Sequence, residues 1–296
     1  MFVSFGAEID RATIEKNTSV SALSRVGPGV RLRSGRATVP GANITTQAQA
    51  DAQIGSPGAK VTCVTQANVE FAEAVIEANE EFAKGYSEIA RRSINNVKGI
   101  SIDPNTEFSE GEQKPRFSST GPSTGQEVTD PTFRNRIIGQ IFLQDSKDGL
   151  SSKMGNRVSL RADEGKDILV GPVRSMANNV IFHALEKSKD PRFSTENFTI
   201  GNNVTYGDSA LVHGGLAIGS DGKESFPGTS VGNDVTLGRN SVVFRATIAP
   251  AKSIGEKSAV INSPLLPTDP NIPARKIFLN NIRQQNGQPA LLNVEW

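Results

Sequence analysis

Few side chains in this chain could do acid–base, metal or thiol chemistry. The 296-residue sequence has two histidines, His183 and His213, and one cysteine, Cys63. Imidazole binds metal ions and exchanges protons near neutral pH, so histidine chemistry must use one or both positions. A lone histidine after an apolar strand is more often structural, and that alternative stays open. The single cysteine excludes an intrachain disulfide framework and a cysteine-rich zinc site. We expect a cytoplasmic or other reducing interior compartment.

Charge and hydropathy exclude several classes of partner. The chain has 32 Lys and Arg against 31 Asp and Glu, which provides no basic field for nucleic acid or anionic membranes. No apolar run approaches the roughly 18 residues that a membrane span needs. The first residues lack the basic-then-apolar order of a signal peptide. We therefore predict neither a nucleic-acid partner nor a membrane span.

Apolar residues recur every six positions in the second half of the chain. The series is Ile200, Tyr206, Val212 and Ile218, then Val231, Leu237 and Val243, then Ile248, Ile254 and Val260. Such steps fit neither a strand nor a helix. They predict a triangular coil with the periodic side chain inward, and with glycine and Asn or Asp permitting the turns. We predict an all-β fold, a left-handed parallel β-helix of hexapeptide repeats.

The same spacing divides the chain into four predicted parts. These are N-terminal coils over 1–64, an insertion over 65–135, the main β-helix over 136–265 and a helical or extended C-terminal segment over 266–296. Within the insertion, an amphipathic stripe predicts a helix over 66–92. The rest of the insertion is rich in Ser, Thr, Gly, Pro and Glu and predicts a flexible loop. The helix either packs on a β-helix face or docks a partner in a larger assembly.

Three ordered motifs carry a family resemblance. They are LRADEG at 160–165, VIFHALE at 180–186 and DSALVHGG at 208–215. On a hexapeptide background, they resemble the γ-class carbonic anhydrases, whose pattern is R-x-D-E-G, then V-x-x-H-A-L-E, then H-x4-H-G. The resemblance covers 157–262 well and does not cover the insertion.

The resemblance implies a homotrimer that hydrates CO₂ reversibly to bicarbonate by attack of a metal-bound hydroxide between subunits. His183 matches the first ligand and His213 the last, but the middle position, five before His213, is Asp208 instead of histidine. Two positions five apart on a triangular coil lie on different sides of the triangle. They can therefore bind one ion only across a subunit interface.

Asp208 leaves two alternatives open. A carboxylate can bind Zn²⁺, and two histidines with one carboxylate suit Fe²⁺, with Co²⁺ a further candidate. The anion would weaken the Lewis acidity of the metal, raise the pKa of its bound water and slow the reaction. Alternatively, Asp208 is only a turn residue and the metal is absent.

The resemblance also implies roles around the metal. Arg161 and Asp163 match an interface ion pair, although a surface pair of small energetic value would look the same. Glu164 and Glu186 match acidic positions that accept and pass on the proton, although surface glutamates are common. Asn293 matches an asparagine near the substrate pocket.

Three functions follow from these observations. The first is a carbonic anhydrase. The second is a catalytically inactive trimeric scaffold or assembly subunit, which Asp208 and the insertion favour. The third is a hexapeptide acyltransferase with one histidine as base, against which the three ordered motifs count.

Overall fold

The structure is a computed structural model and consists mostly of β-strands. It describes residues 1–66, 68–70, 72–73, 75–76, 79–80, 83–84, 87, 116–117, 135–139, 141–162, 168–184, 198–214, 217–218, 224–226 and 229–296. The parallel strands stack into a left-handed β-helix, which confirms the predicted fold. The described residues between 66 and 87 are helical, whereas the predicted loop after residue 92 lies almost wholly outside the described residues. The predicted domain bounds remain predictions.

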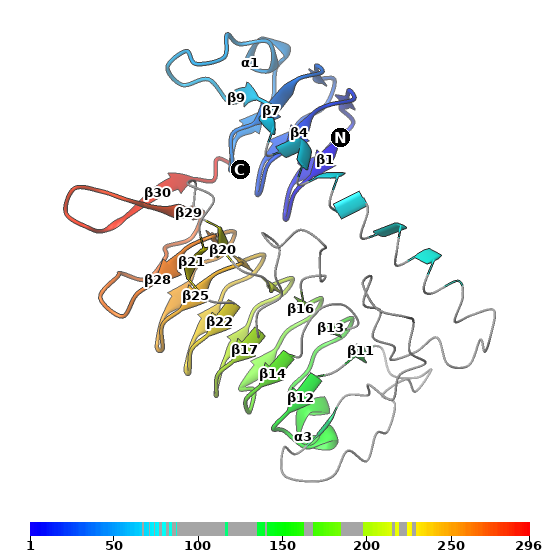
Figure 1. Cartoon of the computed structure of the whole chain (residues 1–296), viewed down its shortest axis with the longest axis vertical. Coiled ribbons are helices and arrows are strands. Elements are labelled where there is room, and N and C mark those ends of the chain that lie inside the picture. The colour runs from blue at the N-terminus through cyan, green and yellow to red at the C-terminus, as the bar shows by residue number, and fades with distance from the viewer. Residues whose placement is uncertain are drawn as a thin grey trace.

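Three sheets form the main β-helix (Figure 1). The seven-stranded sheet contains β10 (Arg116–Phe117), β12 (Ile141–Leu143), β14 (Ile168–Val170), β17 (Phe198–Ile200), β22 (Thr229–Val231), β25 (Thr247–Ile248) and β28 (Pro264–Leu265). The eight-stranded sheet contains β11 (Arg136–Gly139), β13 (Ser159–Ala162), β16 (Ile181–His183), β19 (Leu211–His213), β24 (Val242–Phe244), β27 (Ala259–Ile261), β29 (Lys276–Arg283) and β30 (Pro289–Asn293). The four-stranded sheet contains β15 (Ser175–Met176), β18 (Thr205–Tyr206), β23 (Thr236–Leu237) and β26 (Ser253–Ile254). Outside these sheets lie the helix α3 (Lys147–Ser151) and a hairpin of β20 (Ala217–Ile218) and β21 (Glu224–Phe226).

The period-six residues fill the interior of the coil. Nine of the ten predicted positions are buried in one hydrophobic cluster, and the side chain of the tenth, Ile218, is not described. Successive coils place Val243 on Val260 in register. Burial of these side chains supplies the main favourable free energy of the fold, at roughly 25 cal/mol per Å² of apolar surface.

The sequence predicts that the glycines after the core residues permit turns, and this reason was wrong. The backbone at Gly207 and Gly238 is not in the positive-φ region, whereas a Cβ at these positions would lie 2.6 Å and 2.7 Å from backbone nitrogens of the next coil. Close stacking of coils therefore requires these glycines. The corners with positive φ are instead occupied by residues such as Asn203 and Ser209, of which asparagine tolerates this conformation best.

Residues 1–63, here called the N-terminal unit, form a short β-helix of their own. One sheet contains β1 (Phe2–Val3), β4 (Ser19–Val20), β7 (Arg36–Thr38) and β9 (Val61–Cys63), the second β2 (Glu8–Ile9), β5 (Arg25–Val26) and β8 (Asn43–Ile44), and the third β3 (Thr13–Ile14) and β6 (Arg31–Leu32). Its core includes the predicted positions Val20, Val26, Leu32 and Ile44.

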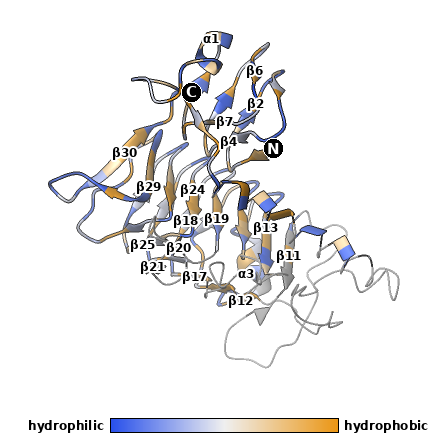
Figure 2. Cartoon of the chain, turned by 45° about the horizontal axis from the view of Figure 1, so that its top comes forward, coloured by the Kyte–Doolittle hydropathy of each residue, from blue (hydrophilic) through white to orange (hydrophobic). Residues whose placement is uncertain are grey.

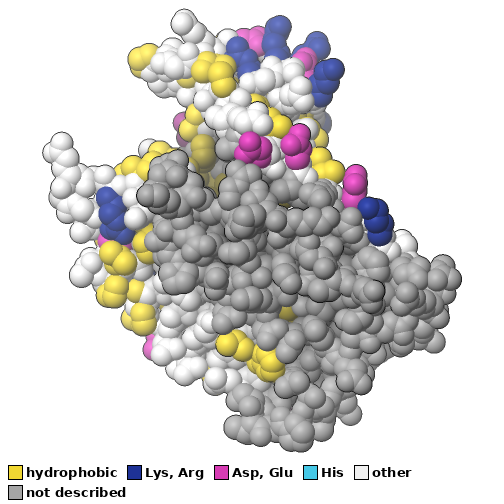
Figure 3. Space-filling view, in the orientation of Figure 1, with side chains coloured by type: hydrophobic (Ala, Val, Ile, Leu, Met, Phe, Trp, Pro, Cys, Tyr) yellow, Lys and Arg dark blue, Asp and Glu magenta, His cyan; other side chains and the backbone are white. Residues whose placement is uncertain are grey.

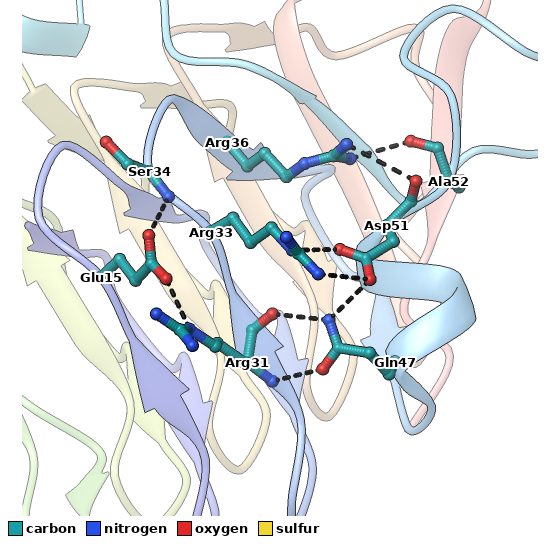
Figure 4. Close-up of polar contacts among 8 residues, drawn as sticks. All are labelled: Glu15, Arg31, Arg33, Ser34, Arg36, Gln47, Asp51 and Ala52. Atoms are coloured by element: carbon teal, nitrogen blue, oxygen red, sulfur yellow. Dashed lines mark hydrogen bonds and ion pairs between the residues drawn. The ribbon is translucent and has the colours of Figure 1, made fainter.

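Arginines hold the last coil of the N-terminal unit, which includes the helix α1 (Gln47–Ala50) (Figure 4). Arg31 contacts Glu15 at 2.5 Å and Arg33 contacts Asp51 at 2.8 Å. Basic side chains gather over this unit in Figure 3, and Arg31 and Arg33 of the unit are each paired with a carboxylate.

The C-terminal segment, predicted as helical or extended, is extended. Strands β29 and β30 pair antiparallel as a hairpin, and the C-terminus lies beside the N-terminal unit (Figure 1). Hydrophobic segments recur along the strands of the main β-helix, including β29 (Figure 2). Among the described residues, no helix is both long and apolar enough to cross a membrane.

Candidate metal centre

The two histidines belong to one column on the outside of the eight-stranded sheet. Parallel register aligns Arg161 with His183, His183 with His213, and His213 with Phe244. The preceding residue in each strand points into the core, because side chains alternate along a strand; these residues are Leu160, Phe182, Val212 and Val243. The fold thus places both imidazoles side by side on the outer surface.

The imidazole rings face each other closely. Nδ1 of His183 lies 3.1 Å from Nε2 of His213, and the rings meet edge to face at 89°. Strands β24 and β27 are joined by a single short coil, which places Val243 on Val260. The connection between the two histidine strands, β16 and β19, is longer. The extra chain between β16 and β19 hides the stacking of the histidines in the sequence.

The His213 ring is held by backbone and aromatic contacts. The residue is 8% exposed, with Phe5 at 5.3 Å and Phe244 at 4.9 Å between ring centroids. Its Nδ1 lies 2.9 Å from the carbonyl oxygen of Gly214. Since a carbonyl only accepts hydrogen bonds, this contact assigns the proton to Nδ1 and the lone pair to Nε2. That lone pair faces His183.

Burial favours the neutral form of His213. The pKa of His213 lies well below its ordinary value, first because of burial and then because of repulsion by the positive charges of His183 and Arg245, although the bond to Gly214 opposes the shift. The imidazole is therefore neutral at pH 7, as a metal ligand must be.

Since Nε2 of His213 carries the lone pair, Nδ1 of His183 donates a hydrogen bond to it in this structure. The separation of the two nitrogens also fits two ligands of one metal ion, which would take the place of that proton. At Zn–N distances of 2.0–2.1 Å, two ligands of a tetrahedral site are separated by about 3.3 Å, close to the observed 3.1 Å. The carbonyl of Gly214 orients one ring through its other nitrogen, a common arrangement around ligating histidines. In the described part of the chain, no three His, Cys, Asp or Glu side chains converge to hold a metal. Within the described residues, one chain therefore offers two ligands.

Asp208 lies at the corner between β18 and β19. Its Oδ1 accepts hydrogen bonds from the backbone nitrogen of Asn178 at 2.9 Å and from Asn178 Nδ2 at 3.2 Å. The Oδ1 atoms of Asn178 and Asn233 accept from backbone nitrogens of the preceding coil in the same way. The carboxylate thus belongs to a series of corner hydrogen bonds between coils.

The remaining predicted positions are distributed as follows. Arg161 is half-buried beside His183 in register. Asp163, Glu164 and Glu186 lie outside the described residues. Asn293 is exposed in β30, with its Oδ1 accepting from Lys276 Nζ. Four strand spacings of about 4.8 Å separate β30 from β19, so a role for Asn293 at the metal requires the copy in a neighbouring subunit.

Sequence reasoning missed two aromatic neighbours of the pair. Phe244 lies beside His213 in register on the neighbouring strand β24, and alignment of the period-six core residues could have placed it there. Phe5 comes from the first turn of the chain and contacts His213 through tertiary packing alone. No repeat or motif connects these two positions.

The chain is similar in sequence to a known enzyme. The chain is 28% identical over 179 residues to a carbonic anhydrase of Methanosarcina thermophila, a match that covers 54% of this chain and 69% of that enzyme. No protein family profile matches the chain. The distant similarity supports a carbonic-anhydrase-like protein and, in general, a metal cofactor.

Proposed function

We propose that the chain is a γ-carbonic-anhydrase-like protein that hydrates CO₂ reversibly to bicarbonate at the interfaces of a homotrimer. His183 and His213 of one chain would bind the metal, Zn²⁺, Fe²⁺ or Co²⁺, together with Asp208 of a neighbouring chain. The observation that carries this proposal is the 3.1 Å approach of His183 Nδ1 to His213 Nε2. The two imidazoles converge there from strands that the β-helix holds in register.

The residues of the chain divide the work. When bound, the metal supplies Lewis acidity that lowers the pKa of water toward 7. His213 supplies a lone pair because burial keeps it neutral. Glu164 or Glu186 would accept the proton and pass it to solvent. Asp208 would add negative charge to the ligand set, so we propose a slow enzyme.

The first test measures metal content and activity together. Protein purified without chelator should contain about one ion per chain and hydrate CO₂. His183→Ala should lose both, whereas Leu169→Ala, an exposed position on β14 of the seven-stranded sheet, should keep both. A wild-type chain without metal and without activity would overturn the proposed enzyme.

A second test asks whether the site is shared. Each site of a cyclic trimer would take its histidines from one chain and Asp208 from the next. Neither His183→Ala nor Asp208→Ala should bind metal alone, whereas co-refolding equal amounts should restore about a quarter of the sites by random assembly. No restoration in mixed trimers would show that Asp208 is not a ligand in trans.

A specific observation favours the alternative, a catalytically inactive trimeric scaffold. Asp208 makes the same corner hydrogen bond as Asn178 and Asn233, so its side chain has a structural role without metal. In that case the insertion over 65–135 would dock a partner in a larger assembly, and metal-free, inert but trimeric protein would be found.

A further inference from the structure

The N-terminal unit closes the outer surface next to His213. The Phe5 ring lies 5.3 Å from the His213 ring and 4.8 Å from the Phe244 ring, centroid to centroid. Leu23 belongs to the same hydrophobic cluster as Val242 and Phe244 of the eight-stranded sheet. The outward face of β19 and β24 is therefore covered by residues from the first coils of the same chain.

Polar contacts to the C-terminal tail fix the position of the unit. Trp296 Nε1 donates to the carbonyl oxygen of Leu23 at 2.7 Å, and Lys60 Nζ lies 2.7 Å from a carboxylate oxygen of Glu295. At Gly41, a Cβ would overlap the backbone oxygen of Asn293. The unit thus docks in one defined arrangement.

The N-terminal unit docks on the main β-helix without sharing a sheet with it. In the described part of the chain, no strand of the N-terminal unit pairs with a strand of the main β-helix, and the unit has its own core of Val20, Val26, Leu32 and Ile44. Side-chain packing and a few tail contacts hold the two parts together. The unit can therefore leave the surface without breaking a ladder of backbone hydrogen bonds.

We propose that the N-terminal unit is an intramolecular cover of the two-histidine site, with Phe5 as the residue that positions the His213 ring. A ligand or a second chain reaches His213 on this flank only when the unit is displaced. The covering follows from the packing alone, whereas the importance of Phe5 for a metal rests on the proposed function.

The test uses the metal-free full chain and the reactivity of its two histidines. Diethyl pyrocarbonate modifies accessible imidazole, and mass spectrometry resolves His183 from His213 on separate peptides. Phe5→Ala should raise the rate at His213 at least fivefold, and more than at His183. The matched control is Val3→Ala, which removes an exposed side chain from the same first turns.

A second pair of variants displaces the unit from a distance. Gly41→Ala and Gly35→Ala impose the same backbone strain, at φ +78 and +79, but only Gly41 lies against the tail, since nothing is within 4 Å at Gly35. Trp296 is the single tryptophan, so its emission reports docking. Gly41→Ala should shift this emission to the red and raise the His213 rate, and Gly35→Ala should do neither.

The outcomes separate the cover from the proposed function. A His213 rate within twofold of wild type in Phe5→Ala, or in a Gly41→Ala protein whose emission has shifted, would overturn the cover. If wild type binds zinc, Phe5→Ala should weaken the affinity at least threefold, and unchanged affinity would overturn the positioning role. A wild-type chain that binds no zinc would overturn the proposed function and the role of Phe5 in positioning a metal ligand. The modification rate of His213 alone would then test whether the N-terminal unit covers the site.

Discussion

Replacing Asp208 by Asn and by Ala separates its two roles. As a corner residue, Asp208 needs only an acceptor oxygen, and Asn178 and Asn233 show that an amide oxygen serves equally well between coils. As a metal ligand, it needs a carboxylate, because its negative charge attracts the ion and an amide oxygen is a weak ligand for zinc. Asn therefore preserves one role and removes the other.

The magnitudes follow from the contacts. Ala removes the acceptor of two hydrogen bonds from Asn178, at 2.9 and 3.2 Å. At about 0.5–1.5 kcal/mol each, and toward the lower end because Asp208 is half-buried, the free energy of unfolding should fall by about 1–2 kcal/mol. Asn should change it by less than about 0.5 kcal/mol. If Asp208 is a ligand, Asn should weaken zinc affinity at least tenfold, or about 1.4 kcal/mol.

Urea denaturation and zinc competition titrations on the same three proteins provide both numbers. If Asn destabilises the fold as much as Ala does, the acceptor does not explain the corner and the reasoning from Asn178 is refuted. If Asn leaves zinc affinity unchanged in a wild type that binds zinc, Asp208 is not a ligand.

Three further predictions concern stability and are measured by denaturation. Arg283 pairs with Asp269 at 2.7 Å and lowers the pKa of this buried carboxyl. The ion pair therefore stabilises the fold above the unfolded pKa near 3.8, and this stabilisation is lost as the pH falls through the lower folded pKa. Asp269→Asn should lower the free energy of unfolding by about 3 kcal/mol at pH 7 and should weaken its dependence on pH in acid. Gly255→Ala would place a Cβ well inside van der Waals contact with the backbone nitrogen of Ala274 and should cost at least about 1–3 kcal/mol; a neutral effect would refute the close-stacking argument. The buried hydroxyl of Tyr206 has no hydrogen-bond partner among the described residues, so Tyr206→Phe should stabilise the fold by about 1 kcal/mol, and a loss would reveal a partner.

Much of the fold could be predicted from the sequence because a β-helix is a local repeat. Each coil stacks on its neighbours, so the inward position recurs at every sixth position and Val212, Val243 and Val260 become core without knowledge of distant contacts. The reason for the glycines could not be predicted. Whether Gly207 serves a turn or a close approach depends on the backbone of the next coil.

The candidate site could be predicted only in part. The motifs identified His183 and His213, but the contact between their rings depends on the register of β16 with β19. This register could not be predicted, because the connection between the two strands does not have a constant coil length. Phe5 could not be predicted, because its contact with His213 joins two stacks of coils that share no sheet. The proton-transfer positions Glu164 and Glu186 stay predictions.

The two histidines differ in access to their side chains, and this difference limits how the proposed trimer can form. His213 lies under Phe5 and beside Phe244, whereas His183 adjoins Arg161 and the exposed Ile181 on the other flank. In the proposed trimer, a neighbouring chain that brings a carboxylate to the pair would therefore approach from the β13 and β16 side while the N-terminal unit stays docked. Docking and trimer formation are then compatible on that flank, and they compete only if the neighbour also needs the surface of β24. An interface that buries Ile181 but leaves Phe5 on His213 is the arrangement consistent with both the proposed metal site and its proposed cover.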